Sequence, residues 1–164
     1  MAIEGAAPRV AIGERLDAYV AARRRGTDWL LARLNPDGSL GDSREGWKYY
    51  RALWTFGATG EVVAAHRVAG FIRRNLVVTD PAGRPTIGGP LRGLLTDWAY
   101  RDATHIVGAQ MIEAYDLGVR LLPSVLADMD PVSGSVANDH LPDGSLSDAG
   151  DIPYACGVGF AALA

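Results

Sequence analysis

The chain has little cysteine, no long apolar run and no excess of positive charge. Its single cysteine, Cys156, excludes an internal disulfide, which suits a reducing compartment, and we predict a cytoplasmic location. No apolar stretch reaches the roughly 18 residues that a membrane span needs. Charged residues at Glu4, Arg9 and Glu14 interrupt the N-terminal region, so the sequence predicts no signal peptide. A net charge of -3 argues against a nucleic-acid partner.

Several chemical signatures are also missing from the sequence. It shows no cysteine and histidine spacing typical of zinc sites, no phosphate-binding glycine loop followed by lysine, and no serine nucleophile elbow. We therefore predict no metal and no cofactor. Residues with high β-propensity cluster only at 76–79, which is too little for a sheet. The 164 residues are enough for one domain, so we predict a single all-α domain over 1–164.

A repeated pentapeptide is the most informative feature that is present. Pro-Asp-Gly-Ser-Leu occurs at 36–40 and again at 142–146, and an aspartate follows two residues later each time, Asp42 and Asp148. Such an identity indicates that one supersecondary unit is used more than once. Loops with proline followed by glycine recur about every two predicted helices, a pattern typical of stacked antiparallel helical hairpins.

The apolar spacing predicts most of the helices. We expect helices at about 13–34, from about 42 to 56, and at 61–76, 97–118 and 121–129, with a last one opening near 154. Leu16, Val20, Thr27, Leu30 and Leu34 should share one face of the first helix. Val62, Ala65, Val68, Ala69 and Ile72 should face inward from the third. The apolar segment 154–164 stops without a polar last turn, so we expect either a truncated protein or a C-terminal helix that self-associates.

One segment resembles a known repeat. Arg25, Gly26, Trp29, Leu30 and Gly38 follow the QW motif of squalene and oxidosqualene cyclases and related prenyltransferase-like repeats. The chain departs from that motif where it has Leu34 for glutamine and Leu40 for tryptophan. A second, degenerate copy starts at Arg67 and includes 70–72.

The resemblance implies an α/α-toroid, in which helical hairpins form a ring around a central cavity. A full ring needs about a dozen helices, so this chain would supply roughly half of one. The family implies acid–base isomerisation or cyclisation of an apolar, terpenoid-like substrate. Two alternatives stay open, because fold alone does not select a chemistry. The first is a carbohydrate-active toroid, such as a sugar epimerase, glycoside hydrolase or lyase, and the second is a non-catalytic helical-repeat module that binds a ligand.

The candidate catalytic residues lie on one predicted helix. Trp98, Asp102 and His105 are spaced i, i+4 and i+7 and so share one helical face. Asp102 could act as an acid or orient His105, whose ordinary pKa allows it to carry protons near neutrality. The alternative is a carboxylate that favours the helix dipole beside a hydrogen-bonded core histidine.

Aromatic residues near loop-to-helix junctions are the candidate substrate wall. They could stack on sugars or stabilise carbocations, although they could equally be core residues behind capping aspartates. The candidates are Trp47, Tyr50, Trp98, Tyr100 and Tyr154. A further segment, Asp128-Met129-Asp130-Pro131, resembles the Asp-x-Asp-Asp acid motif of class II terpene cyclases but lacks the last aspartate. We interpret it as a helix end followed by a turn.

Overall fold

The computed structural model describes residues 7–42, 49, 51–88, 98–127, 129 and 131–132, with side chains at these positions except 7–11 and 98–100. The described part contains five helices and one small antiparallel sheet, so the all-α prediction is confirmed. The helices are α1 (Ala7–Leu31), α2 (Ala52–Thr59), α3 (Val62–Asn75), α4 (Trp98–Met111) and α5 (Tyr115–Ala127); the strands are β1 (Val77–Thr79) and β2 (Pro85–Ile87).

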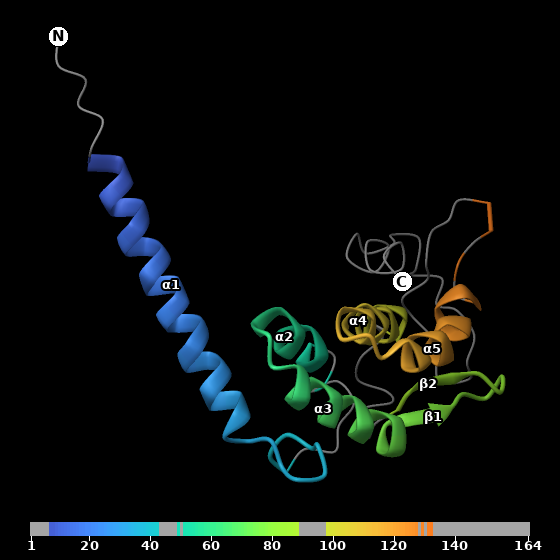
Figure 1. The fold of residues 1–164 in the computed structure, drawn as a ribbon. Helices are drawn as coiled ribbons and strands as arrows, with labels where there is room; N and C mark the ends of the chain where they lie inside the picture. The colour runs from blue at the N-terminus through green and yellow to red at the C-terminus, as the bar shows by residue number, and fades with distance from the viewer. Residues whose placement is uncertain are drawn as a thin grey trace.

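Helices α2 to α5 form two pairs of consecutive helices, called hairpins below, that pack side by side. Short turns connect α2 to α3 and α4 to α5, and α2 also packs against α4 (Figure 1). On the other side, Arg73 of α3 makes a bidentate ion pair with Asp116 of α5, with Nε to Oδ2 at 2.7 Å. The repeated stacked units that the pentapeptide indicates remain a prediction, because its second copy lies outside the described residues. The closed ring remains a prediction.

Close helix packing creates the core between the two hairpins. Gly108 of α4 lies against α2, where an added Cβ would come within 2.7 Å of the Leu53 Cβ. The large side chains of the core are almost fully buried and include Tyr49, Leu53, Phe56, Phe71, Ile72, Ile106, Leu117 and Leu121. Tyr49 also stacks on Phe71, with ring centroids 5.2 Å apart. Dense apolar packing of this kind supplies most of the stability of short helices.

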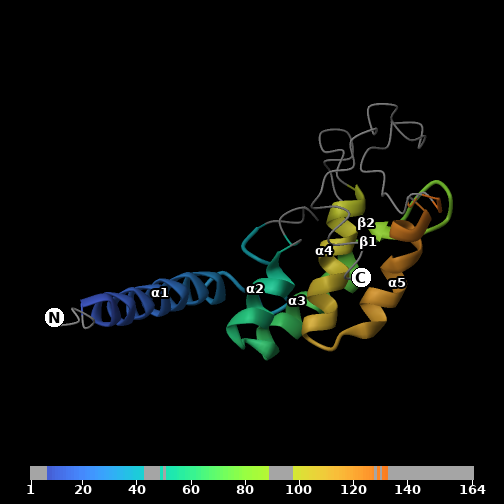
Figure 2. The same ribbon diagram turned by 90° about the horizontal axis from the view of Figure 1, so that it is seen from above.

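Strands β1 and β2 are the main departure from the predicted elements. We expected no sheet, whereas Val77 pairs with Ile87 and Thr79 with Pro85 in an antiparallel hairpin. The β-branched residues at 77–79 therefore form a strand because a partner strand lies close in the sequence. The hairpin lies beside α5 in Figures 1 and 2, and Gly88 continues it by donating from its backbone N–H to the Leu76 carbonyl at 2.6 Å.

The boundary between the fourth and fifth predicted helices was also wrong. The chain turns at 112–114, before the predicted end of the long helix at 118, and α5 then runs through Pro123. A proline inside a helix leaves the carbonyl four residues earlier without its usual donor. Here that carbonyl belongs to Val119, on an exposed side of α5. Water can therefore hydrate the carbonyl, which makes the proline tolerable.

Helix α1 extends away from the hairpins and touches them only near its end (Figures 1 and 2). Of the face predicted for this helix, Thr27 is buried, and Leu30 and Leu34 pack against the core. Leu16 and Val20 are instead 57% and 54% exposed. On α3, the inward prediction is confirmed at 65, 68, 69 and 72 and wrong at Val62, which is 51% exposed.

The first copy of the repeated pentapeptide is a turn that docks on α3. Within the turn, Asp37 accepts hydrogen bonds from the backbone N–H and hydroxyl of Ser39 at 2.9 and 2.6 Å. Gly38 adopts φ +91° and lies so close to α3 that an added Cβ would be 2.1 Å from the Arg67 carbonyl oxygen. Arg67 and Arg74 then donate to the carbonyls of Asn35 and Asp37. Glycine is therefore required both by the conformation and by the contact. The second copy lies outside the described residues.

Candidate functional site

The predicted catalytic aspartate is the centre of a buried hydrogen-bond network. Asp102 is 2% exposed on α4. Its Oδ2 accepts from the Thr86 hydroxyl of β2 at 2.6 Å and from the Ser124 hydroxyl of α5 at 2.7 Å. Its Oδ1 accepts from the Ile87 backbone N–H at 3.0 Å. The Asp102 carboxylate of α4 thus connects strand β2 with helix α5.

The charge of Asp102 is partly balanced by its neighbour. Burial raises the pKa of Asp102 above its ordinary value, while Arg101 and the three hydrogen-bond donors act in the opposite direction. The Arg101 Nε lies 3.8 Å from Oδ1, and the arginine side chain is only 15% exposed. A buried carboxylate with three donors and a nearby cation is well adapted to holding elements together.

The second predicted catalytic residue, His105, lies one turn further along α4 and is 0% exposed. Its Nδ1 is 2.8 Å from the Arg101 carbonyl oxygen. A carbonyl can only accept, so Nδ1 must carry the proton of this hydrogen bond. Burial lowers the pKa of His105 to about 4. The ring is therefore neutral at pH 7, and its Nε2 carries a free lone pair.

Nε2 of His105 is the unusual atom of this site. It is buried, and no group in the part of the chain that the structure describes forms a hydrogen bond with it. Buried polar atoms in folded proteins nearly always have a partner, because an unsatisfied one costs about 1–3 kcal/mol. The atom is a hydrogen-bond acceptor held in a fixed orientation by the bond at Nδ1.

The aromatic residues of the predicted substrate wall are described only in part. Trp98 and Tyr100 lie in the first turn of α4, ahead of Asp102, but their side chains are outside the description. Trp47, Tyr50 and Tyr154 lie outside the described residues, as do Asp128, Asp130 and Cys156. The wall therefore stays a prediction.

Thr86 and Ser124 are partners of Asp102 that the sequence did not reveal. Each is almost fully buried, at 2% and 7% exposed. Thr86 lies in a segment rich in proline and glycine, and Ser124 directly follows Pro123, so neither belongs to a motif that would identify it. Their role depends on the β-hairpin, whose formation the sequence analysis did not predict.

The described residues contain no group of three or more histidine, cysteine, aspartate or glutamate side chains placed to bind a metal ion. Within the same ranges, no helix is long and apolar enough to cross a membrane. Comparison with protein-family models, with curated proteins and with solved structures finds no match to this chain.

Proposed function

We propose that the chain is part of a helical-hairpin enzyme that carries out acid–base isomerisation or cyclisation of an apolar, terpenoid-like small molecule. The observation that supports it is the buried Nε2 lone pair of His105, which has no hydrogen-bond partner among the described residues and is oriented by the bond from Nδ1 to the Arg101 carbonyl. Groups that transfer protons are typically held in this way, with one ring nitrogen fixed so that the other can react.

The low pKa of His105 suits one step of such chemistry. A carbocation is a strong acid at the carbon next to its charge, so even a weak base can remove that proton. The C–H electron pair then forms the new alkene, and Nε2 takes the proton. In the resulting imidazolium, both ring nitrogens carry hydrogens, and Nδ1 keeps its bond to the Arg101 carbonyl.

Asp102 has a different role in this proposal. Both of its carboxylate oxygens already accept hydrogen bonds, from Thr86, Ile87 and Ser124. It would therefore act as a positioning residue that fixes α4, and His105 with it, against the β-hairpin and α5. We assign to His105 the removal of the proton from the carbocation.

The test is proton exchange with solvent. Full-length protein would be incubated in D2O with a panel of linear terpenoid alkenes and prenyl diphosphates, and products analysed by mass spectrometry. We expect isomerised or cyclised products from the wild type, with deuterium at any alkene carbon that was protonated from solvent to form the carbocation, and none from His105→Leu. His66→Leu is the matched control, because His66 is an exposed histidine on α3. Equal turnover by His105→Leu, or no turnover of any terpenoid by the wild type, would reject the proposal.

A non-catalytic helical-repeat module is the second candidate, and one observation favours it. Asp102 and His105 are 2% and 0% exposed, so neither is reachable from solvent in this conformation. Diethyl pyrocarbonate, which acylates accessible imidazoles, distinguishes the two functions. Modification of His105 that a bound terpenoid blocks supports the enzyme. Modification of His66 but not of His105, with or without terpenoid, supports the module.

A further inference from the structure

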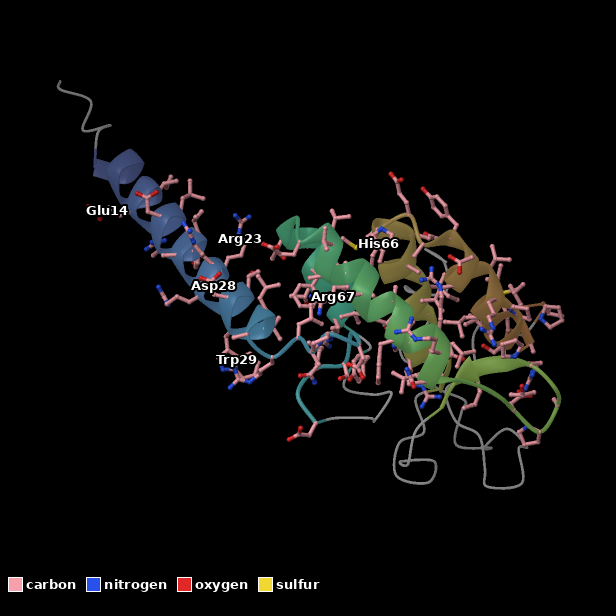
Figure 3. The ribbon with its side chains drawn as sticks, turned by 60° about the horizontal axis from the view of Figure 1, so that its bottom comes forward. Glu14, Arg23, Asp28, Trp29, His66 and Arg67 are labelled. Atoms are coloured by element: carbon pink, nitrogen blue, oxygen red, sulfur yellow. The ribbon has the colours of Figure 1, made fainter. Side chains whose placement is uncertain are left out.

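Most of α1 has no neighbour among the described residues. Every residue from 12 to 26 is exposed, and the first buried one is Thr27, at 8%. Figure 3 shows Glu14 near the free end of this helix and Arg23 closer to the loop that leads to the hairpins. Isolated helices of about 12–15 residues are marginal in water, because packing of one face normally stabilises them. The exposed turns of α1 should therefore unwind locally while the hairpins stay folded.

The exposed part of α1 carries three consecutive arginines, Arg23, Arg24 and Arg25, called the arginine run below. Successive residues of an α-helix point about 100° apart, so these side chains spread around the helix and cannot form one basic face. In an extended segment, neighbouring side chains instead follow one another along a line. A protein that binds the unwound segment can therefore hold two adjacent arginines in two adjacent acidic pockets. An endoprotease specific for paired basic residues recognises its substrate in this way.

A second arginine pair, Arg73-Arg74 on α3, provides an internal comparison. It is the only other place in the sequence where arginine or lysine residues are adjacent. Helix α3 packs into the core at this point, since the preceding residue, Ile72, is 0% exposed. The Arg73 guanidinium also binds the Asp116 carboxylate, and Arg74 donates to the Asp37 carbonyl at 3.0 Å. Unwinding this pair would disrupt the core, whereas unwinding the arginine run would break only contacts within α1.

We propose that the arginine run is a processing site, at which an endoprotease specific for paired basic residues cleaves α1 after Arg24 or Arg25. In the cut after Arg25, water adds across the peptide bond. The Arg25 carbonyl carbon gains an oxygen and becomes a carboxylate, the C–N bond breaks, and Gly26 keeps the nitrogen as a free amine. All the described buried residues stay on the C-terminal product, because the first of them is Thr27. This inference does not depend on the proposed function.

Mass spectrometry of limited digests tests the site. The full chain would be incubated in native buffer with a subtilisin-type endoprotease that cuts after paired basic residues. We expect cleavage after Arg24 or Arg25, and cleavage at least about a hundredfold slower after Arg74, because proteolysis follows the population of the locally open state. Each rate is divided by that of a synthetic peptide, 19–30 or 69–80, which corrects for sequence preference. Equal corrected rates at the two pairs, or no cleavage of the arginine run, would overturn the proposal.

Arg24→Gln tests recognition, because it removes both adjacent pairs of the arginine run. It should slow cleavage at least about thirtyfold, since an acidic pocket of the protease is left without its cation. Arg15→Gln, the same change elsewhere on α1, is the matched control and should leave the rate unchanged. The product that begins at Gly26 should keep the urea-unfolding midpoint of the uncut chain, since it retains the described core. Unchanged cleavage of Arg24→Gln, or a product with a lower midpoint, would contradict a removable α1.

Discussion

Thr86 and Ser124 lie far apart in the sequence, yet their hydroxyls donate to the same oxygen, Oδ2 of Asp102. We expect Thr86→Val, which keeps the shape of the side chain, to lower the free energy of unfolding by about 2 kcal/mol, because it removes a hydrogen bond to a buried carboxylate. Urea unfolding measures this loss. Thr59→Val is the control and should change stability by less than about 0.5 kcal/mol, since the Thr59 hydroxyl bonds only to carbonyls of its own helix.

His105 should make stability depend on pH. Its pKa is about 4 when folded, against 6.5 as the ordinary value, so the unfolded chain binds more protons between these values. The contribution of His105 to the free energy of unfolding is fully present above about pH 6.5. It decreases by up to about 3 kcal/mol as the pH falls to 4.

Variants isolate this effect from other titrating groups, including Asp102, whose raised pKa gives the opposite slope. Urea unfolding at several pH values measures the free energies of unfolding of the wild type and of His105→Leu. Below pH 6.5, the wild type should lose stability relative to His105→Leu. His66→Leu, which removes an exposed histidine of α3, is the control. A wild type and His105→Leu with parallel pH profiles would contradict a buried neutral histidine.

Gly38 should tolerate no side chain. We expect Gly38→Ala to destabilise the protein by about 2–4 kcal/mol, because the new Cβ would collide with the Arg67 carbonyl and because φ +91° is strained for alanine. Gly41→Ala provides the comparison, since Gly41 has φ +56° but nothing within 4 Å of an added Cβ. That variant should lose only about 1 kcal/mol in thermal or urea unfolding. Equal losses would show that the contact with α3 is unimportant.

Glu113 offers a site for stabilisation. It has φ 60°, while Ala114 donates from its backbone N–H to the Ala109 carbonyl at 2.8 Å, a helix-terminating pattern that normally uses glycine. The same pattern ends α2 with Gly60 at φ 82°. Glu113→Gly should therefore raise the free energy of unfolding by about 0.5–1 kcal/mol. Gly60→Ala, the reverse change, should lower it by about 1 kcal/mol.

The sequence predicted local features better than long-range ones. The third helix was placed within a residue or two because Ala65, Val68 and Ile72 repeat at helical spacing. The turn at Pro36 was visible from proline and glycine chemistry. The β-hairpin was missed because each of its strands has only three residues, too few to show alternation. The prediction that α4 continues to 118 failed because Glu113 ends the helix where glycine would ordinarily mark the stop.

For the site, the sequence placed Asp102 and His105 on one helix but could not show what surrounds them. Their burial depends on β2 and α5, which approach α4 only through tertiary packing. The orientation of His105 follows from a backbone carbonyl, which is present at every residue and so leaves no trace in the sequence. Leu16 and Val20 of α1 have the apolar spacing of a buried helix face and yet are exposed. Periodicity identifies which residues share a face but not what packs against that face.

The pairing of consecutive helices has a consequence for synthesis on the ribosome. Helices α2 and α3 are neighbours in the chain and in space, and so are α4 and α5. The first hairpin can therefore form as soon as it has left the exit tunnel, before α4 has emerged from it. Such short-range topology favours fast folding, because little chain entropy is lost in closing each hairpin. The Asp102 network, which needs β2, α4 and α5 together, would then be completed only after Ser124 has emerged.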